Sequence, residues 1–257
     1  MPAIDAVLIV IAGIGAGTIN SIVGSGTLIT FPTLVFLGLP PLAANVSNNV
    51  GLVAGGLSAS WGYRRELRGT SPLLRQLLPL SIVGSLIGAA LLLVLPPAAF
   101  RAVVPVLITL ALVLVLVGPR LQAQVAKGAA AQGSMPSWHR PALRAGVLLG
   151  GMYGGYFGAA QGVLLMGLFS ALSAESLQRL TGFKNVLVTS VNLVAAAAFI
   201  IFAREHINWV AAALVAIGSL IGGLLGARIG RRLPPVALRA VIVLVGLIAI
   251  AKMVWWS

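Results

Sequence analysis

The 257-residue chain contains no cysteine, only four acidic residues and two histidines, and 8% of its residues are charged. The lack of cysteine excludes disulfides, thiolate catalysis and cysteine-bound metals. Soluble domains carry about 25% charged residues, so this chain cannot form an ordinary water-facing surface. Its uncharged runs, such as 6–63, 76–100 and 207–227, are long enough for membrane-spanning helices. The sequence therefore predicts an all-α polytopic membrane protein, and the formal net charge of +13 is not taken as a sign of nucleic-acid binding.

The residues that other function classes require are also scarce. The two histidines, His139 and His206, lie far apart in predicted loops, which argues against a metal or haem site. There is no phosphate-binding loop of the ATPase type. No carboxylate is placed to carry protons inside the membrane, because the acidic residues all lie away from the middle of the apolar runs: Asp5, Glu66, Glu175 and Glu205. We therefore expect no enzyme activity, no cofactor, no metal and no cleaved signal peptide.

The chain contains an internal repeat. Residues 84–88 (GSLIG) recur unchanged as 218–222, and a shift of 136 residues places Asn49 on Asn185 and Gly26 on Gly162. Two halves are predicted, with the following bounds: a first repeat over 1–118 (hairpin 4–38, helices 42–63, 73–95 and 99–118), a linker over 119–140, and a second repeat over 141–257 (hairpin 141–173, helices 177–203, 207–228 and 236–254).

Each half begins with an apolar segment that is interrupted, at 20–26 and at 158–162. The apolar pieces that follow, 27–37 and 163–172, are about 15–17 Å long as helices, against a hydrocarbon core of ~30 Å. Each piece therefore reaches only to the middle of the membrane. The pair in each half is either a re-entrant hairpin or a single broken crossing.

Basic residues favour the hairpins. Re-entrant hairpins leave three crossings per half, so the halves are inverted and equivalent loops face opposite sides. Placing loops 64–75, 118–144, 175–184 and 228–239 in the cytoplasm puts 14 basic residues inside and 3 outside, whereas broken crossings give 10 and 7. We therefore predict two inverted repeats, each a re-entrant broken-helix hairpin plus three transmembrane helices. Both termini are expected outside and the linker in the cytoplasm.

The interruptions are candidates for a substrate site. In each hairpin a half-helix begins near the midplane, where its free N–H groups and positive dipole end favour an anion. Glycine there allows close approach to the backbone, although the interruptions could also be simple packing kinks. The candidate residues at the two interruptions are Gly24, Ser25, Gly26, Thr27, Gln161 and Gly162.

A polar cluster follows each hairpin, at the start of the next predicted helix. Its residues either face the site or hydrogen-bond between helices. Lys184 aligns with Asn48 and is either a counter-charge for an anion or a side chain that extends to the interface beside Arg179. The cluster residues are Asn45, Ser47, Asn48, Asn49, Thr181, Lys184 and Asn185.

Glycines spaced four residues apart are expected to be helix-packing contacts rather than functional sites. They occur in three places along the chain: Gly13/Gly17, Gly84/Gly88 and Gly218/Gly222/Gly226.

Residues 24–32 (GSGTLITFP), followed by 44–49 (ANVSNN), resemble the TauE/SafE family, of the toluene-sulfonate uptake permease type. The segments 84–97 and 218–235 fit the same family. The interruptions depart from its usual glycine runs, with Gly-Ser-Gly in the first half and Ala-Ala-Gln-Gly in the second. The resemblance implies a secondary carrier that exports sulfite or a small organosulfonate across a bacterial inner membrane, so that both termini are expected to be periplasmic.

Together these features predict a secondary transporter that holds a small sulfur-containing oxyanion at a midplane site. A passive anion channel with the same site is the alternative. An intramembrane enzyme and a structural subunit are weaker rivals. The expected partners are the small anion and the lipid bilayer, and the oligomeric state is left open.

Overall fold

The computed structural model describes residues 2–68, 72–131, 139–172 and 175–229, with 240, 242–244 and 247. This part of the chain is helical and contains no strand, which confirms the all-α prediction. The elements in order are α1 (Ala3–Ile22), α2 (Thr27–Phe36), α3 (Pro41–Gly62), α4 (Pro72–Val94), α5 (Pro97–Ala131), α6 (His139–Tyr156), α7 (Gln161–Leu172), α8 (Leu177–Phe202), the 3-10 helix η1 (Arg204–His206) and α9 (Trp209–Ile229).

Several helices are suited to a bilayer. Within the described residues, α1, α4, the Pro97–Gly118 part of α5, α8 and α9 are long and apolar enough to cross a membrane. Large apolar side chains on their outer faces are exposed, such as Val106 on α5 and Ile201 on α8. Because such side chains are stable outside only in a lipid environment, the prediction of a polytopic membrane protein is confirmed.

Each interrupted segment folds back on itself. A Cβ atom on Gly26 would lie 2.5 Å from the carbonyl oxygen of Ala16, and one on Gly15 would lie 3.8 Å from Ile29. These pairings place α2 antiparallel to α1. In the second half, Gly146 packs against Leu168 and Gly150 against Leu165, which makes α6 and α7 antiparallel as well. The two segments are therefore helical hairpins rather than single helices with a break.

The repeated glycine motif packs one half against the other. In α9, a Cβ on Gly218 or Gly222 would overlap the carbonyl oxygen of Val10 or Ile14 in α1. The order of these contacts shows that α9 and α1 run parallel with their backbones in close approach. The spaced glycines of α1 and α9 are helix contacts, as expected.

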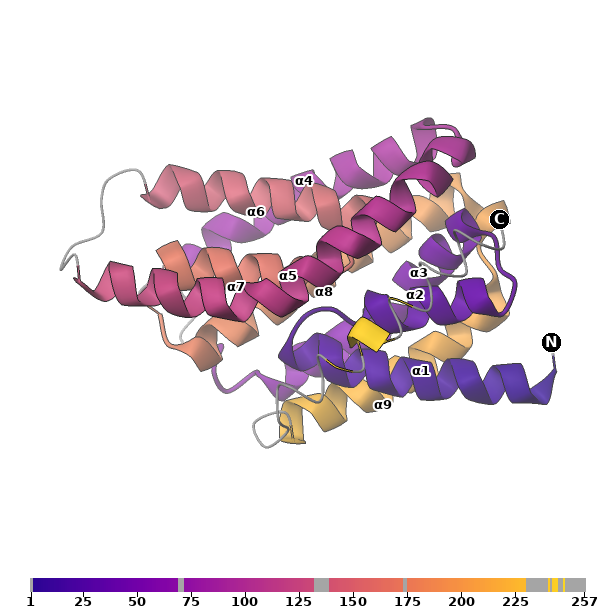
Figure 1. The fold of residues 1–257 in the computed structure, drawn as a ribbon, viewed down its shortest axis with the longest axis horizontal. Coiled ribbons are helices and arrows are strands. Elements are labelled where there is room, and N and C mark those ends of the chain that lie inside the picture. Colours follow the sequence, from indigo (N-terminus) through magenta and orange to yellow (C-terminus); the bar gives the residue numbers. More distant parts are fainter. Residues whose placement is uncertain are drawn as a thin grey trace.

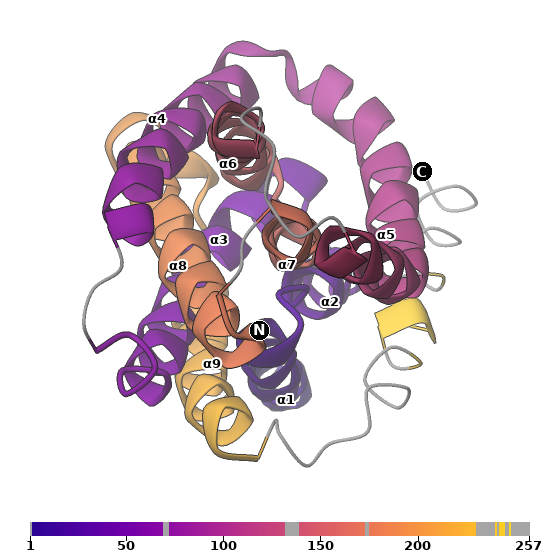
Figure 2. The same ribbon diagram turned by 90° about the vertical axis from the view of Figure 1, so that its left-hand side faces the viewer.

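The same motif makes the corresponding contact in α4. A Cβ on Gly84 or Gly88 would overlap the carbonyl oxygen of Leu148 or Met152 in α6, so α4 and α6 also run parallel. Each half thus supplies the helix that packs against the hairpin of the other. In Figure 1, α1 runs inward from one end of the bundle and α6 from the opposite end. Figure 2 shows α2 and α7 near the centre, with the longer helices around them.

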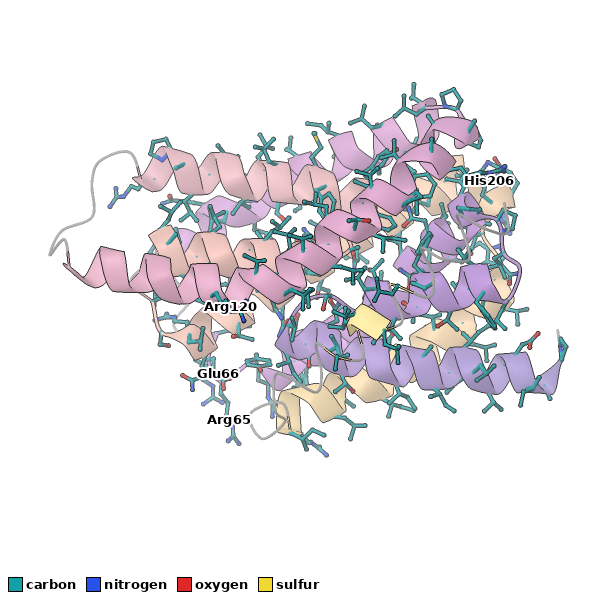
Figure 3. The ribbon with its side chains drawn as sticks, in the orientation of Figure 1. Arg65, Glu66, Arg120 and His206 are labelled. Carbon is teal, nitrogen blue, oxygen red and sulfur yellow. The ribbon has the colours of Figure 1, made fainter. Side chains whose placement is uncertain are left out.

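Basic residues gather at one end of this bundle. Figure 3 places Arg65 and Glu66 at one end and His206 at the other. The end that contains Arg65 is called the basic end, and the helix directions bring these residues to it: Arg64, Arg65, Arg68, Arg75, Arg140, Arg144, Arg179 and Arg228. Arg101 and Arg204 lie at the opposite end. The described arginines of the loops that the sequence groups on one side of the membrane therefore share one end of the molecule.

The long helices that follow each hairpin (α3, α4, α5, α8 and α9) begin and end within two residues of the predicted positions, with one exception. Helix α5 continues to Ala131, well beyond the predicted end at residue 118 and into the predicted linker. The added segment, residues 119–131, contains five alanines and two glutamines, which favour helix regardless of a membrane. The last predicted helix, 236–254, lies mostly outside the described residues.

Candidate functional site

The two hairpins meet at their tips, which are residues 23–27 and 157–162. The backbone N–H of Gly162 donates a hydrogen bond to the carbonyl oxygen of Gly24, with an N···O distance of 3.0 Å. A Cβ on Gly24 would overlap the Cα of Gly162, and Gly24 has a φ of +85°. Any other residue at position 24 would therefore be strained and would push the tips apart. Two segments far apart in sequence thus touch through their backbones.

The tips are related by a shift of 134 residues rather than 136. Helices α1 and α6 end at Ile22 and Tyr156, and the positive-φ glycines that follow are Gly24 and Gly158. The shift becomes 136 farther along because α7 has 12 residues and α2 has 10. Consequently Gly26 corresponds in the structure to an alanine and not to Gly162, so the glycine contact at the tips is not symmetric.

Polar atoms at the tips are buried without partners. Ser25 and Gln161 are each 1% exposed. Within the described residues, neither the hydroxyl of Ser25 nor the side-chain amide of Gln161 has a hydrogen-bond partner. A buried polar group left unpaired costs about 1–3 kcal/mol. A polar ligand that paired these atoms would therefore recover that energy on binding.

Lys184 is fully buried beside the first tip. Its Nζ donates hydrogen bonds of 2.9 Å to the carbonyl oxygen of Asn20 and 3.1 Å to that of Ser21, in the last turn of α1. The stem of the side chain also passes the second tip, because a Cβ on Gly162 would lie 3.0 Å from Cδ of Lys184. The lysine therefore does not extend to the interface beside Arg179. An ammonium group has three donors, so one is left for a ligand.

The cluster on each half contacts the hairpin of the other. Asn185 joins Lys184 by donating to the carbonyl oxygen of Ser21, at 3.2 Å. In the reverse direction, Asn45 on α3 donates to the carbonyl oxygen of Tyr156 at the end of α6, at 3.0 Å. These side chains pair carbonyl groups that the last turn of a helix leaves unsatisfied. They hold the two tips in place as well as facing them.

The other cluster residues differ in what they contact. Asn48 accepts a hydrogen bond from the hydroxyl of Thr30 in α2, and Asn49 has a buried side-chain oxygen without a partner in the described residues. Ser47 instead accepts a 2.8 Å hydrogen bond from the N–H of Asn208, before α9. The hydroxyl of Thr181 donates within its own helix to Leu177. The structure therefore brings Asn48 to the hairpin, and neither Ser47 nor Thr181.

Two residues at the tips were not among the sequence candidates. The hydroxyl of Tyr153 donates a 2.6 Å hydrogen bond to the carbonyl oxygen of Ala159, which supports the second tip from α6. The side-chain oxygen of Asn20 accepts from the N–H of Gly26 at 3.5 Å. The available signals were a tyrosine in a glycine-rich apolar segment and an asparagine at the start of the first interruption.

The centre of the bundle is electrically positive. The starts of α2 and α7 contribute the positive ends of two helix dipoles, and Lys184 adds a basic side chain beside them. All four acidic residues of the chain lie at helix ends or in loops away from the tips. A centre with this charge attracts an anion and repels a cation.

Interrupted helices that meet at the centre of a membrane bundle are typical of membrane transporters. The chain belongs to the sulfite exporter TauE/SafE family, whose model matches residues 9–253. This result confirms the resemblance seen in residues 24–32 and 44–49.

Curated relatives agree with that class. A probable membrane transporter protein of Haemophilus influenzae is 27% identical over 243 residues, covering 95% of this chain and 92% of the relative. The probable membrane transporter protein YfcA of Escherichia coli K12 is 27% identical over 244 residues, covering 94% and 87%. No solved structure matches the chain significantly. The names of these relatives assign them to the membrane transporters and not to an enzyme class. The protein is therefore a membrane transporter.

Proposed function

We propose that the protein is a secondary transporter that exports a small sulfur-containing oxyanion, sulfite or an organosulfonate, across the bacterial inner membrane. The observation that carries the proposal is the meeting of the two hairpin tips beside the fully buried Lys184. The family description supports sulfite as the substrate. Export is favoured by the membrane potential, because one negative charge that moves outward gains about 2.3 kcal/mol per 100 mV.

In the proposed site the anion lies against the starts of α2 and α7. The third N–H of Lys184 supplies the counter-charge, and the hydroxyl of Ser25 and the amide of Gln161 donate to the substrate oxygens. Thr27 and the backbone N–H groups of the two half-helices complete the set of donors. An oxyanion with three oxygens offers acceptors for all of these groups.

The proposed topology places the basic end in the cytoplasm and the N-terminus in the periplasm. The two halves are then inverted, and each hairpin enters from its own side and stops at the centre. The direct contact between Gly24 and Gly162 supports a carrier over a passive channel. A carrier opens to one side at a time, whereas a channel needs a continuous path past this contact.

The experiment is counterflow of radiolabelled sulfite with the purified protein in liposomes. Proteoliposomes loaded with unlabelled sulfite, with the membrane potential held at zero by equal potassium on both sides and valinomycin, are expected to accumulate label transiently. A carrier exchanges labelled for unlabelled substrate under these conditions, whereas a channel at zero potential only equilibrates the label. The same preparation tests whether the protein acts without a partner subunit. Equilibration without accumulation would favour the channel, and no sulfite movement would contradict the proposed substrate.

Variants link the transport to the tips. We expect Ser25→Ala and Gln161→Ala each to raise the KM for sulfite about tenfold, as loss of one hydrogen bond to a charged group costs about 1.5–3 kcal/mol. Thr181→Ala is the matched control, because its hydroxyl bonds only within α8. Normal KM values in both tip variants would place the substrate elsewhere.

A further inference from the structure

A cavity of about 190 Å³ lies away from the tips, between the first turns of α4 and α6. These helices run parallel and both begin at the basic end. The cavity opens where the membrane-spanning part of α4 begins. Both helices line it, with four residues from α4 and three from α6: Pro72, Leu73, Gln76, Leu77, Arg140, Leu143 and Arg144.

The lining combines an apolar wall with two cations. Leu77 and Leu143 are buried and form the floor, whereas Arg140 and Arg144 are exposed. Arg144 reaches across from α6, and its Nη2 donates a 3.0 Å hydrogen bond to Oε1 of Gln76 on α4. This bond holds one guanidinium group over the cavity, and among the described residues its other N–H donors have no partner. Two arginines facing one small cavity suit a phosphate group, which arginine binds through paired hydrogen bonds.

The surroundings indicate that the phosphate belongs to a lipid. Along α4 and α6, beyond the arginines, the outer surface is apolar and exposed, with Leu86 at 50% and Leu149 at 59%. A lipid whose headgroup reaches the arginines can lay its acyl chains along this surface. Basic pockets between transmembrane helices at the cytoplasmic side are suited to anionic headgroups.

The corresponding place in the other half lacks these features. Helices α9 and α1 pack in parallel like α4 and α6, but their first turns carry Trp209 and Asp5 and no arginine. The basic residues are therefore not needed for this type of helix packing. They distinguish one end of the molecule from the other.

We propose that the cavity between α4 and α6 is a binding site for the phosphate headgroup of an anionic membrane lipid. Arg140 and Arg144 pair with the phosphate, Gln76 positions Arg144, and the leucines contact the first carbons of the lipid. The site lies apart from the hairpin tips and does not depend on the identity of the transported anion.

The test is native mass spectrometry of the full-length protein in detergent, titrated with phosphatidylglycerol or phosphatidylcholine. Wild-type protein is expected to retain one phosphatidylglycerol at least tenfold more tightly than phosphatidylcholine. The double variant Arg140→Gln/Arg144→Gln is expected to lose this preference. The control is Arg64→Gln/Arg65→Gln, which removes the same charge at the same end but outside the cavity. Thermal unfolding of both variants in detergent alone checks that they fold.

A competition arm separates a lipid from a soluble phosphate compound. Inorganic phosphate and glycerol phosphate at millimolar concentration are expected to leave the bound phosphatidylglycerol in place. Displacement by either would show a soluble anion site and overturn the lipid assignment. The proposal would also be overturned if both double variants lost the preference for phosphatidylglycerol equally. Unchanged phosphatidylglycerol binding by Arg140→Gln/Arg144→Gln would overturn it as well.

Discussion

At the scale of single residues, the contact between Gly24 and Gly162 brings the two halves together at the centre. Gly24 meets two separate demands, a positive φ of +85° and a backbone neighbour that leaves no room for a Cβ. Gly38 meets only the first, because it has a φ of +94° and nothing lies within 4 Å of its Cβ position. Substitutions at Gly24 and Gly38 therefore separate the effect of backbone strain from that of steric overlap.

We predict that Gly24→Ala lowers the sulfite transport rate at least tenfold and lowers the unfolding temperature more than Gly38→Ala does. Both changes carry a left-handed backbone penalty of about 1–2 kcal/mol, but only Gly24→Ala forces the tips apart. Transport in liposomes and thermal unfolding in detergent measure the two effects. Equal behaviour of the two variants would show that the tip contact is dispensable.

Lys184 has two tasks, because it pairs with the end of α1 and is proposed to face the substrate. We predict that Lys184→Met lowers the unfolding temperature and raises the KM for sulfite at least tenfold. Removing the ammonium takes the side-chain partner from the Asn20 carbonyl, at about 1–3 kcal/mol, whereas the Ser21 carbonyl keeps its hydrogen bond from Asn185. Asn185→Leu removes a hydrogen bond to the same Ser21 carbonyl without changing charge. It is expected to affect stability and not KM.

The two readouts distinguish these tasks. A Lys184→Met protein that is less stable but binds sulfite with normal KM would reduce the lysine to a structural cap for α1. An increase of KM in Asn185→Leu equal to that in Lys184→Met would assign the effect to displacement of the tip rather than to the charge.

At the scale of elements, the parallel pairs α1–α9 and α4–α6 depend on glycine at the contact. A Cβ on Gly88 of α4 would overlap the carbonyl oxygen of Met152, whereas one on Gly150 of α6 would sit 3.4 Å from the Leu165 side chain. We predict that Gly88→Ala lowers the stability by more than 1 kcal/mol, the scale of overpacking penalties. Gly150→Ala is expected to be neutral or to stabilise, because alanine favours helix by up to about 1 kcal/mol.

Denaturation monitored by circular dichroism in detergent compares the two variants. Both variants replace a glycine with alanine inside a helix, Gly88 in α4 and Gly150 in α6. The gain in helix propensity is therefore the same in both and cancels when their stabilities are compared. A Gly88→Ala protein as stable as Gly150→Ala would mean that α4 and α6 can separate without loss.

Several of these elements could be predicted from the sequence because their signals are local. Apolar runs and prolines located the long helices that follow each hairpin to within two residues, apart from the end of α5. Glycines located both interruptions. The end of α5 was missed because residues 119–131 favour helix without being apolar. The pairing of Lys184 with Asn20 could not be inferred, because the two residues lie 164 positions apart. The acceptor is also a backbone carbonyl, which every residue has and which no sequence pattern distinguishes. For the same reason, nothing local separated Asn45, which reaches a tip, from Ser47, which holds the start of α9.

At the scale of the whole molecule, the proposed inversion of the two halves makes a prediction that their sequence similarity alone does not. Pro40 and Ser176 are equivalent residues, each at the N-cap of the helix that follows its hairpin. In inverted halves they face opposite sides of the membrane, whereas two broken crossings would put both on the same side. The chain has no cysteine, so a single introduced cysteine can be labelled without background from native thiols.

We predict that Pro40→Cys reacts with a membrane-impermeant maleimide in intact spheroplasts and that Ser176→Cys reacts only after the membrane is permeabilised. The physical reason is the charge at the basic end, which resists translocation across the membrane. Glu205→Cys and Gln178→Cys provide a second pair at the same two ends and are expected to label like Pro40→Cys and Ser176→Cys. Labelling of Pro40→Cys and Ser176→Cys from the same side would contradict the inverted topology. Because the tips could not then approach from opposite faces, the proposed central anion site would be contradicted as well.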